Sequence, residues 1–286
     1  MAVIKLLRVH QWIKNGFVFL PIFFAGEFLN TQLLFGAFLA FIAFSLTSSI
    51  VYILNDYKDI EKDKLHPVKK NRPLANGGIS KRNALLLLIP LSAAIVCLAA
   101  FNFTLVSLIP LALYFILNLL YTFYLKVIAI LDVAIIAVGF VLRVIFGGLV
   151  TSIFVSKWAL LLTFSLALVL ALGKRRGELI STENEARPSL KGYNLPFIDT
   201  ALTITVAITL VCYIMYTISP DVVEGFGSEY VYATTLFVLL GLLRYLQQTM
   251  VHEKTESPTK FVYTDIFVQL MIVCWVLSFV LIIYFK

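Results

Sequence analysis

The stretch NALLLLIPLSAAIVCLAAFNFTLVSLIPLALYFILNLLYTFY, residues 83–124, is apolar almost from end to end. A helix needs roughly 20 mostly apolar residues to cross a membrane, so this stretch is long enough for two such helices. Asn102 and Phe103 separate an apolar run over 83–101 from a second over 104–124. The sequence therefore predicts two spanning helices joined by a tight turn, and with them an integral membrane protein.

The composition of the whole chain agrees with this stretch. Of its 286 residues, 60% are hydrophobic and 14% are charged, and the mean hydropathy is +0.95. Soluble chains average about 45–50% apolar and about 25% charged residues. The composition thus argues against a soluble domain, a disordered chain and a disulfide scaffold. Apolar runs extend along the entire chain, which predicts a single polytopic membrane domain over 1–286.

Outward from 83–124, further apolar runs predict an all-α fold with about nine transmembrane helices. The predicted spans are 15–30, 33–54, 83–101, 104–124, 128–150, 157–173, 198–219, 230–247 and 262–284. The first is the weakest, because Pro21 and Glu27 interrupt it.

The positive charges indicate the orientation of these helices. With nine spans, 20 of the 23 Lys and Arg residues lie on the side that holds the N-terminus and the long loops. Such an excess is typical of cytoplasmic loops. We therefore expect a multi-pass protein of the inner (cell) membrane with its N-terminus and active site facing the cytoplasm. The net charge of +7 has the same explanation, so we expect no nucleic-acid partner. The functional residues are expected in two cytoplasmic loops, 55–82 and 174–197.

The first of these loops begins with NDYKDIEKD, residues 55–63. Asp56, Asp59 and Asp63 are spaced by three and four residues, which places them on one face of a helix. Carboxylate oxygens suit Mg²⁺, which is typically held by one or two carboxylates together with substrate phosphates. Asn55 adds a neutral oxygen. The sequence predicts a magnesium site here, and the alternative is a solvated helix end.

Basic residues follow the acidic motif. Lys69 and Arg72 lie in HPVKKNRPLANGG, residues 66–78, where turn-forming Pro and Gly accompany the cations. Lys126 lies in the turn between the fourth and fifth predicted spans. All three are candidate phosphate ligands. The alternative for each is the ordinary positive charge of a cytoplasmic loop.

Two ionisable residues lie within the predicted span 128–150. Asp132 and Arg143 are 11 residues apart, or about three helical turns, so they share a face of the helix. Charged groups inside a span are costly and usually face a cavity or a partner. We expect both residues to belong to a substrate site, with structural pairing to neighbouring helices as the alternative.

The motif NDYKD at 55–59 with Asp63, followed by NRPL at 71–74, resembles the first signature of the UbiA-type prenyltransferase superfamily. The nine helices and the two long cytoplasmic loops also resemble that family. The resemblance implies a helical bundle whose aspartates bind Mg²⁺ and a diphosphate at the cytoplasmic mouth. It also implies a groove within the membrane for a lipid chain.

The second loop departs from the general pattern of the superfamily. Members that prenylate aromatic acceptors carry a second aspartate-rich motif, whereas this chain has GKRRGEL at 173–179 and no aspartate after it before Asp199. Lys174, Arg175 and Arg176 suit an additional anion, and Glu178 accompanies them. Together with GFVLR at 139–143, this pattern is similar to the decaprenyl-phosphate phosphoribosyltransferase branch of the superfamily.

That resemblance implies transfer of a 5-phosphoribosyl group from phosphoribosyl diphosphate to a polyprenyl phosphate, with Mg²⁺ as cofactor and diphosphate as product. The residues assigned to catalysis are Asp56, Asp59, Asp132 and Lys174, and those assigned to substrate binding are Asn55, Asp63, Lys69, Arg72, Lys126, Arg143, Arg175, Arg176 and Glu178.

Two other functions are kept as alternatives. The first is transfer of an isoprenoid from an allylic diphosphate to an aromatic or glyceryl-phosphate acceptor. The second is transport of a lipid phosphate, with the basic residues used for binding alone. The length of the polyprenyl chain and the existence of a homo-oligomer are left open.

Overall fold

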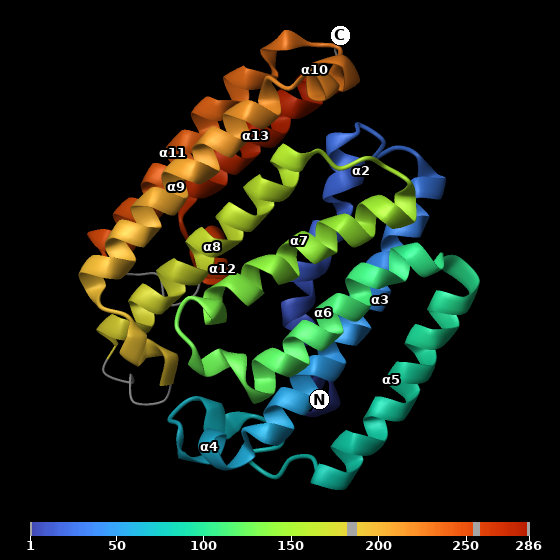
Figure 1. Ribbon diagram of the computed structural model, residues 1–286, viewed down its shortest axis with the longest axis vertical. Helices are drawn as coiled ribbons and strands as arrows, with labels where there is room; N and C mark the ends of the chain where they lie inside the picture. The colour runs from blue at the N-terminus through green and yellow to red at the C-terminus, as the bar shows by residue number, and fades with distance from the viewer. Residues whose placement is uncertain (1, 182–187, 254–257, 285–286) are drawn as a thin grey trace. The chain divides into compact units, whose positions relative to one another are not determined.

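The computed structural model describes residues 2–181, 188–253 and 258–284, and all regular structure within them is helical (Figure 1). The elements are α1 (Ala2–Leu7), η1 (Val9–Phe19), α2 (Leu20–Phe24), α3 (Thr31–Lys58), α4 (Ile60–Leu65), η2 (Lys69–Asn71), α5 (Lys81–Asn102), α6 (Leu105–Phe123), η3 (Leu125–Val127), α7 (Leu131–Thr151), α8 (Lys157–Ile180), η5 (Pro188–Gly192), α9 (Leu195–Thr217), α10 (Pro220–Phe226), η6 (Glu229–Thr234), α11 (Thr235–Met250), α12 (Pro258–Thr264) and α13 (Ile266–Tyr284). The predicted all-α fold is confirmed.

Seven helical segments of the described chain are long and apolar enough to cross a membrane. They are α3, α5, α6, α7, α8, α9 and the continuous segment Glu229–Met250. The described apolar part of α13, Ile266–Ile282, is slightly shorter. Each of these eight elements overlaps one of the predicted spans, so the chain is a multi-pass membrane protein.

The region predicted as the first span, 15–30, has a different structure. It contains the end of the 3₁₀ helix η1 and the short helix α2, and Gly26 then adopts a positive φ of 70°. Side chains of α3 hold this segment: Asn15 donates from Nδ2 to the hydroxyls of Ser45 (3.0 Å) and Ser48 (3.2 Å). Trp12 likewise donates to Ser49 at 3.0 Å. Because α2 has only five residues, few backbone hydrogen bonds stabilise this segment, and these side-chain hydrogen bonds to α3 add to them.

Capping residues determine where most of the spanning helices begin. In each case a side-chain oxygen accepts the backbone N–H three residues further on, which satisfies one of the free donors of the first turn. The capping residues are Asn30 for α3, Ser80 for α5, Thr104 for α6, Ser156 for α8 and Asn194 for α9. The residue that precedes each of these helices therefore determines where the helix begins.

The chain is divided into two compact units, one formed by residues 1–126 and 142–154 and the other by residues 127–141 and 155–286. Helix α7 contributes its first half to the second unit and its second half to the first unit. Each unit has packing of its own.

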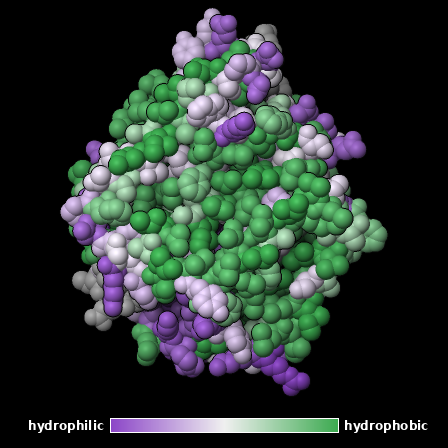
Figure 2. Space-filling model, in the orientation of Figure 1, coloured by the Kyte–Doolittle hydropathy of each residue, from purple (hydrophilic) through white to green (hydrophobic). Residues whose placement is uncertain are grey.

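In the first unit, α3 packs against α5, α6 and η1 (Figure 1). Ile50 and Ile53 of α3 and Leu91 of α5 belong to its buried core. Only 6% of the apolar window of α5 is buried, so most of its side chains are available to lipid. Figure 2 shows hydrophobic residues over α5 and α6 and a concentration of hydrophilic residues near α4.

In the second unit, α8 packs along α9, and α11 packs along α13. Val169 and Leu172 of α8, Leu202 of α9 and Tyr245 of α11 form its largest described core together with residues of α12 and α13. Helix α8 extends past its predicted end at residue 173 to Ile180. GKRRGEL therefore continues a helix, whereas the sequence predicts a loop that begins at 174.

At Gly147 the backbone of α7 lies close to the backbone of η1, which allows the packing of the first unit to be tested. A Cβ atom at Gly147 would lie 2.0 Å from the carbonyl oxygen of Val18 in η1. We expect Gly147→Ala to lower the free energy of unfolding by about 1–3 kcal/mol, because backbone atoms must move to admit the methyl group. Thermal unfolding in detergent measures this change.

Gly36→Ala is the matched control, because the nearest atom to the added Cβ would be a Val150 methyl at 3.8 Å, an ordinary contact distance. Equal stability of the two variants would contradict the close approach of η1 and α7.

Candidate active site

The acidic motif lies where α3 ends and α4 begins. Helix α3 continues past its predicted end to Lys58, so Asn55 and Asp56 belong to its last turn. Asp59 is the junction residue, with φ −96° and ψ 8°, and Asp63 lies in α4. The backbone N–H of Asp63 still donates to the carbonyl of Asp59 at 2.8 Å. The helical register therefore continues through the junction and brings Asp56 and Asp63 to the same cation.

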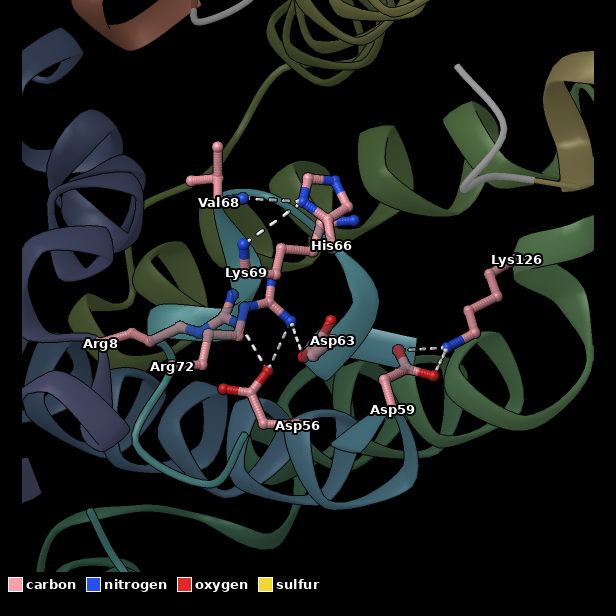
Figure 3. A network of polar contacts seen from close by, with 9 residues as sticks. All are labelled: Arg8, Asp56, Asp59, Asp63, His66, Val68, Lys69, Arg72 and Lys126. Carbon is pink, nitrogen blue, oxygen red and sulfur yellow. Dashed lines mark hydrogen bonds and ion pairs between the residues drawn. The ribbon is translucent and has the colours of Figure 1, made fainter. Parts of the chain in front are cut away.

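Two of these carboxylates share one arginine (Figure 3). Nη1 of Arg72 lies 3.1 Å from Oδ1 of Asp56 and 2.6 Å from Oδ2 of Asp63. Asp56 and Asp63 are 2% and 4% exposed, so both charges are largely removed from water. A buried carboxylate needs a charged or hydrogen-bonded partner, and Arg72 provides one to both.

The third carboxylate has a partner of its own. Nζ of Lys126, in η3, lies 2.8 Å and 2.6 Å from the two carboxylate oxygens of Asp59. Figure 3 shows Asp59 directed towards Lys126 and away from Arg72. Asp56 and Asp63 thus meet at one cation, and Asp59 meets another.

Arg8 is a member of this cluster that the sequence analysis did not identify. Its Nη2 donates to Oδ1 of Asp56 at 2.5 Å, and its guanidinium lies 4.9 Å from the ring centroid of Tyr52. In the sequence, Arg8 is one of several N-terminal cations. Its spacing of four residues from Trp12, which also contacts α3, is the signal that could have identified it.

The segment between Asp63 and Arg72 is held by the side chain of His66. Nδ1 of His66 accepts the backbone N–H groups of Val68 (3.2 Å) and Lys69 (3.3 Å). Nδ1 is therefore an acceptor in this turn. The turn precedes η2, and the backbone N–H of Arg72 donates to the carbonyl of Lys69, the first residue of η2, at 2.9 Å.

Arg143 is buried elsewhere in the first unit. Its Nε donates to Oδ1 of Asn15 at 2.8 Å, and its Nη2 lies 3.3 Å from the hydroxyl of Tyr114. The guanidinium also lies 4.7 Å and 4.8 Å from the ring centroids of Phe44 and Tyr114. This cation is thus surrounded by neutral oxygens and aromatic faces, at 4% exposure.

In the second unit, Asp132 is fully buried and accepts several hydrogen bonds. Nε of Arg175 donates to its Oδ2 at 2.7 Å, the hydroxyl of Ser189 donates to the same oxygen at 2.9 Å, and the hydroxyl of Tyr193 donates to Oδ1 at 2.6 Å. Burial, followed by the bond to Asp132, raises the pKa of the Tyr193 hydroxyl, which keeps it a donor. Ser189 and Tyr193 belong to no motif, so no sequence pattern marks them as partners of Asp132.

The cations of GKRRGEL differ in exposure. Arg175 is 1% exposed and donates from Nη1 to Glu178 at 2.8 Å as well as to Asp132. Arg176 is also buried and bonds Asp199 and the carbonyl of Thr249. The side chain of Lys174 is 49% exposed and lies 3.9 Å from Glu178. Lys174 is therefore the most accessible of the three cations.

The predicted residues thus form separate groups. The first group contains Asp56, Asp59, Asp63, Arg72 and Lys126, with Asn55 and Lys69 on the adjoining backbone. The second group contains Asp132, Arg175, Glu178 and Lys174. Arg143 and Arg176 each have other partners. Part of the predicted loop 174–197, including Glu183, Glu185 and Arg187, lies outside the described residues.

The donor atoms of the first group suit a hard divalent cation. Both ion pairs of Asp56 use Oδ1, and the ion pair of Asp63 uses Oδ2, so these ion pairs do not occupy the second oxygen of either carboxylate. Within the described chain no three His, Cys, Asp or Glu side chains converge on one metal position. Mg²⁺ commonly takes one or two carboxylates and completes its shell with phosphates and water, so Asp56 and Asp63 fit that ion.

Comparisons with known proteins agree with this fold. The sequence profile of the UbiA prenyltransferase family matches residues 16–271. The chain is 30% identical to the decaprenyl-phosphate phosphoribosyltransferase of Mycolicibacterium smegmatis, over 100% of this chain and 93% of that one. It is 29% identical to the protein of the same name from Mycobacterium tuberculosis, over 96% of this chain and 92% of that one.

A solved structure has the same overall fold. The UbiA homolog from Archaeoglobus fulgidus bound to DMAPP and Mg²⁺ superposes with a TM-score of 0.68 at 18% identity and covers 99% of both chains. The profile match extends over most of the sequence and the curated relatives align along nearly all of it. The chain therefore belongs to the UbiA prenyltransferase family and is a membrane-embedded transferase of that family.

Proposed function

We propose that the protein transfers a 5-phosphoribosyl group from phosphoribosyl diphosphate to a polyprenyl phosphate and releases diphosphate. The observation that carries this proposal is the similarity along the entire chain to proteins named decaprenyl-phosphate phosphoribosyltransferase. The acidic cluster supports it, because a carboxylate group ringed by cations suits a metal-bound diphosphate.

In the proposed reaction, an oxygen of the lipid phosphate forms a bond to C1 of the ribose while the bond between C1 and the diphosphate oxygen breaks. The electron pair of the broken bond leaves with the diphosphate. The lipid phosphate is already an anion at neutral pH, so the step requires no strong general base. His66 has another role, since its Nδ1 accepts two backbone N–H groups.

Asp56 and Asp63 would hold Mg²⁺, together with the neutral oxygen of Asn55. Asp59 pairs with Lys126 in this structure and would join them only after it leaves that cation. When bound, Mg²⁺ supplies Lewis-acid stabilisation of the departing diphosphate. Arg72, Lys126 and Lys69 would bind diphosphate oxygens and orient the donor. Catalysis of this kind is mostly orientation and charge compensation.

The buried groups receive positioning roles in the proposal. Asp132 holds the guanidinium of Arg175, and Arg175 in turn holds Glu178 beside the exposed Lys174. We assign to Lys174 a contact with a substrate phosphate. Arg176 fastens α8 to α9 and α11. Arg143 holds polar groups inside the first unit, where it would border the bound substrate. The cytoplasm is the proposed side of the reaction, in the inner membrane.

Purified protein tests the proposal directly. We expect diphosphate release when phosphoribosyl diphosphate and polyprenyl phosphate are supplied together with Mg²⁺, and none when EDTA replaces Mg²⁺. Release measured by an enzyme-coupled diphosphate assay, with the lipid product followed by mass spectrometry, is the readout. Turnover of an allylic diphosphate in place of phosphoribosyl diphosphate would refute the assigned donor.

A further inference from the structure

Each carboxylate of the acidic cluster lies against a cation in this structure. Arg8 and Arg72 contact Asp56, Arg72 also contacts Asp63, and Lys126 contacts Asp59. With these three carboxylates and three cations ionised, the formal charges of the cluster cancel. An isolated divalent cation therefore meets a group that is already neutralised, and it must displace basic side chains to reach the carboxylates.

The backbone at Arg8 supports a function for its side chain. Arg8 has φ 51° and ψ 45°, a left-handed conformation that residues with a Cβ adopt at a cost in free energy. It lies between α1 and η1, where α3 holds the chain from both sides: Ser49 donates to the carbonyl of Leu7 at 2.9 Å and accepts from Trp12 at 3.0 Å. The strained residue thus directs its guanidinium to Asp56.

The guanidinium of Arg8 has room to change partners. Its side chain is 19% exposed, whereas that of Asp56 is 2% exposed. Its contact with the face of Tyr52 keeps it beside the cluster, and a guanidinium fork carries five N–H donors with which it can bind an anion. Arg72 already contacts two carboxylates and Lys126 already holds Asp59. Arg8 is therefore the cation of the cluster whose ion pair uses a single carboxylate oxygen.

The charge of a complete ligand alters this balance. A diphosphate ester that arrives with Mg²⁺ brings net negative charge, which offsets the cations once they leave the carboxylates. Charge-assisted bonds from a guanidinium to phosphate oxygens are at least as favourable as bonds to carboxylate. The exchange therefore gives the carboxylates a metal partner and the released cations a phosphate partner, which a divalent cation alone does not achieve.

We propose that Arg8 is a further binding residue of the diphosphate site. Arg8 pairs with Asp56 in the free protein and exchanges this carboxylate for a diphosphate oxygen when the ligand binds. The cluster therefore favours a metal–diphosphate complex over free metal. This inference rests on the diphosphate-binding part of the proposed function. It does not depend on the identity of the group attached to the diphosphate.

The test uses the detergent-solubilised full chain and two titrations followed by calorimetry. The first titrates Mg²⁺ alone, and the second titrates inorganic diphosphate in the presence of saturating Mg²⁺. In Arg8→Gln we expect the affinity for Mg²⁺ alone to rise about tenfold, because a competitor for Asp56 is gone. We expect the affinity for diphosphate with Mg²⁺ to fall about tenfold, because a charge-assisted bond is lost.

Opposite shifts of the two affinities distinguish this role from a structural one. If Arg8 only supported the fold, its removal would leave both affinities unchanged or lower both, and either result would overturn the proposal. Lys5→Gln is the matched control, since Lys5 is an exposed cation of α1 three residues away. It should change neither affinity.

Arg8→Lys keeps the test valid if Arg8→Gln does not yield folded protein. Lysine retains the charge and loses the fork and the stacking on Tyr52, so we expect both shifts in the same directions at roughly threefold. No shift in either titration would overturn the proposal. Opposite shifts in a protein that does not turn over phosphoribosyl diphosphate would uphold the role of Arg8 and overturn the proposed function.

Discussion

Asp56→Asn is expected to lower the rate of diphosphate release by roughly a thousandfold. Asp56 is the most buried of the three clustered carboxylates and the one that contacts both Arg8 and Arg72. The amide cannot supply the negative charge that a divalent cation requires, and it is a weaker acceptor for the two guanidinium groups. The coupled assay for released diphosphate, in saturating Mg²⁺, measures this effect.

The same substitution should leave the fold intact. Arg8 and Arg72 are 19% and 25% exposed, so water can solvate both cations when the carboxylate becomes an amide. Glu61→Gln is the matched control in the same segment, because Glu61 pairs with Lys64 at the surface and contacts no member of the cluster. It should retain activity. Near-normal turnover by Asp56→Asn would contradict the assignment of the metal site.

Asp132→Ala is expected to have the largest effect on stability, with a loss of about 3–5 kcal/mol in the free energy of unfolding. The substitution leaves the guanidinium of Arg175 buried at 1% exposure without its fully buried carboxylate. It also removes the acceptor of Ser189 and Tyr193. Thermal or denaturant unfolding in detergent, followed by the fluorescence of the tryptophans, measures the change.

Asp199→Ala serves as a comparison within the same unit. Asp199 pairs with Arg176 but its side chain is 34% exposed, and Arg176 keeps a bond to the carbonyl of Thr249. We expect a loss of roughly 1 kcal/mol or less. Replacement of both partners, Asp132→Leu with Arg175→Met, should recover much of the lost stability. An Asp132→Ala protein with unchanged stability and no activity would instead make Asp132 a catalytic residue.

Much of the fold could be predicted from the sequence because the bilayer imposes a simple length rule. The turn predicted at Asn102 and Phe103 lies between α5 and α6, and the capping residues Ser80 and Thr104 explain those boundaries. The region 15–30 could not be predicted in this way. Its structure depends on bonds from Asn15 and Trp12 to serines about 30 or more residues away, which no local pattern contains.

The site could be predicted in part. The spacing of Asp56 and Asp63 places both at Arg72, so the acidic motif identifies two of its three carboxylates as neighbours. The direction of Asp59 towards Lys126 depends on the helix junction and on η3, which lies 67 residues further along the chain. The burial of Arg175 could not be predicted. The sequence pattern assigns its positive charge to a substrate anion, whereas in the structure Asp132 and Glu178 pair with it.

The contact between Arg143 and Asn15 has a consequence for the order of events during synthesis. Asn15 and its serine partners in α3 are made first, and Arg143 follows 128 residues after Asn15. A guanidinium enters a bilayer at a high cost unless acceptors await it. The N-terminal segment, which is synthesised first, therefore supplies the acceptor for Arg143 of α7. Loss of the first fifteen residues should impair the membrane insertion of α7.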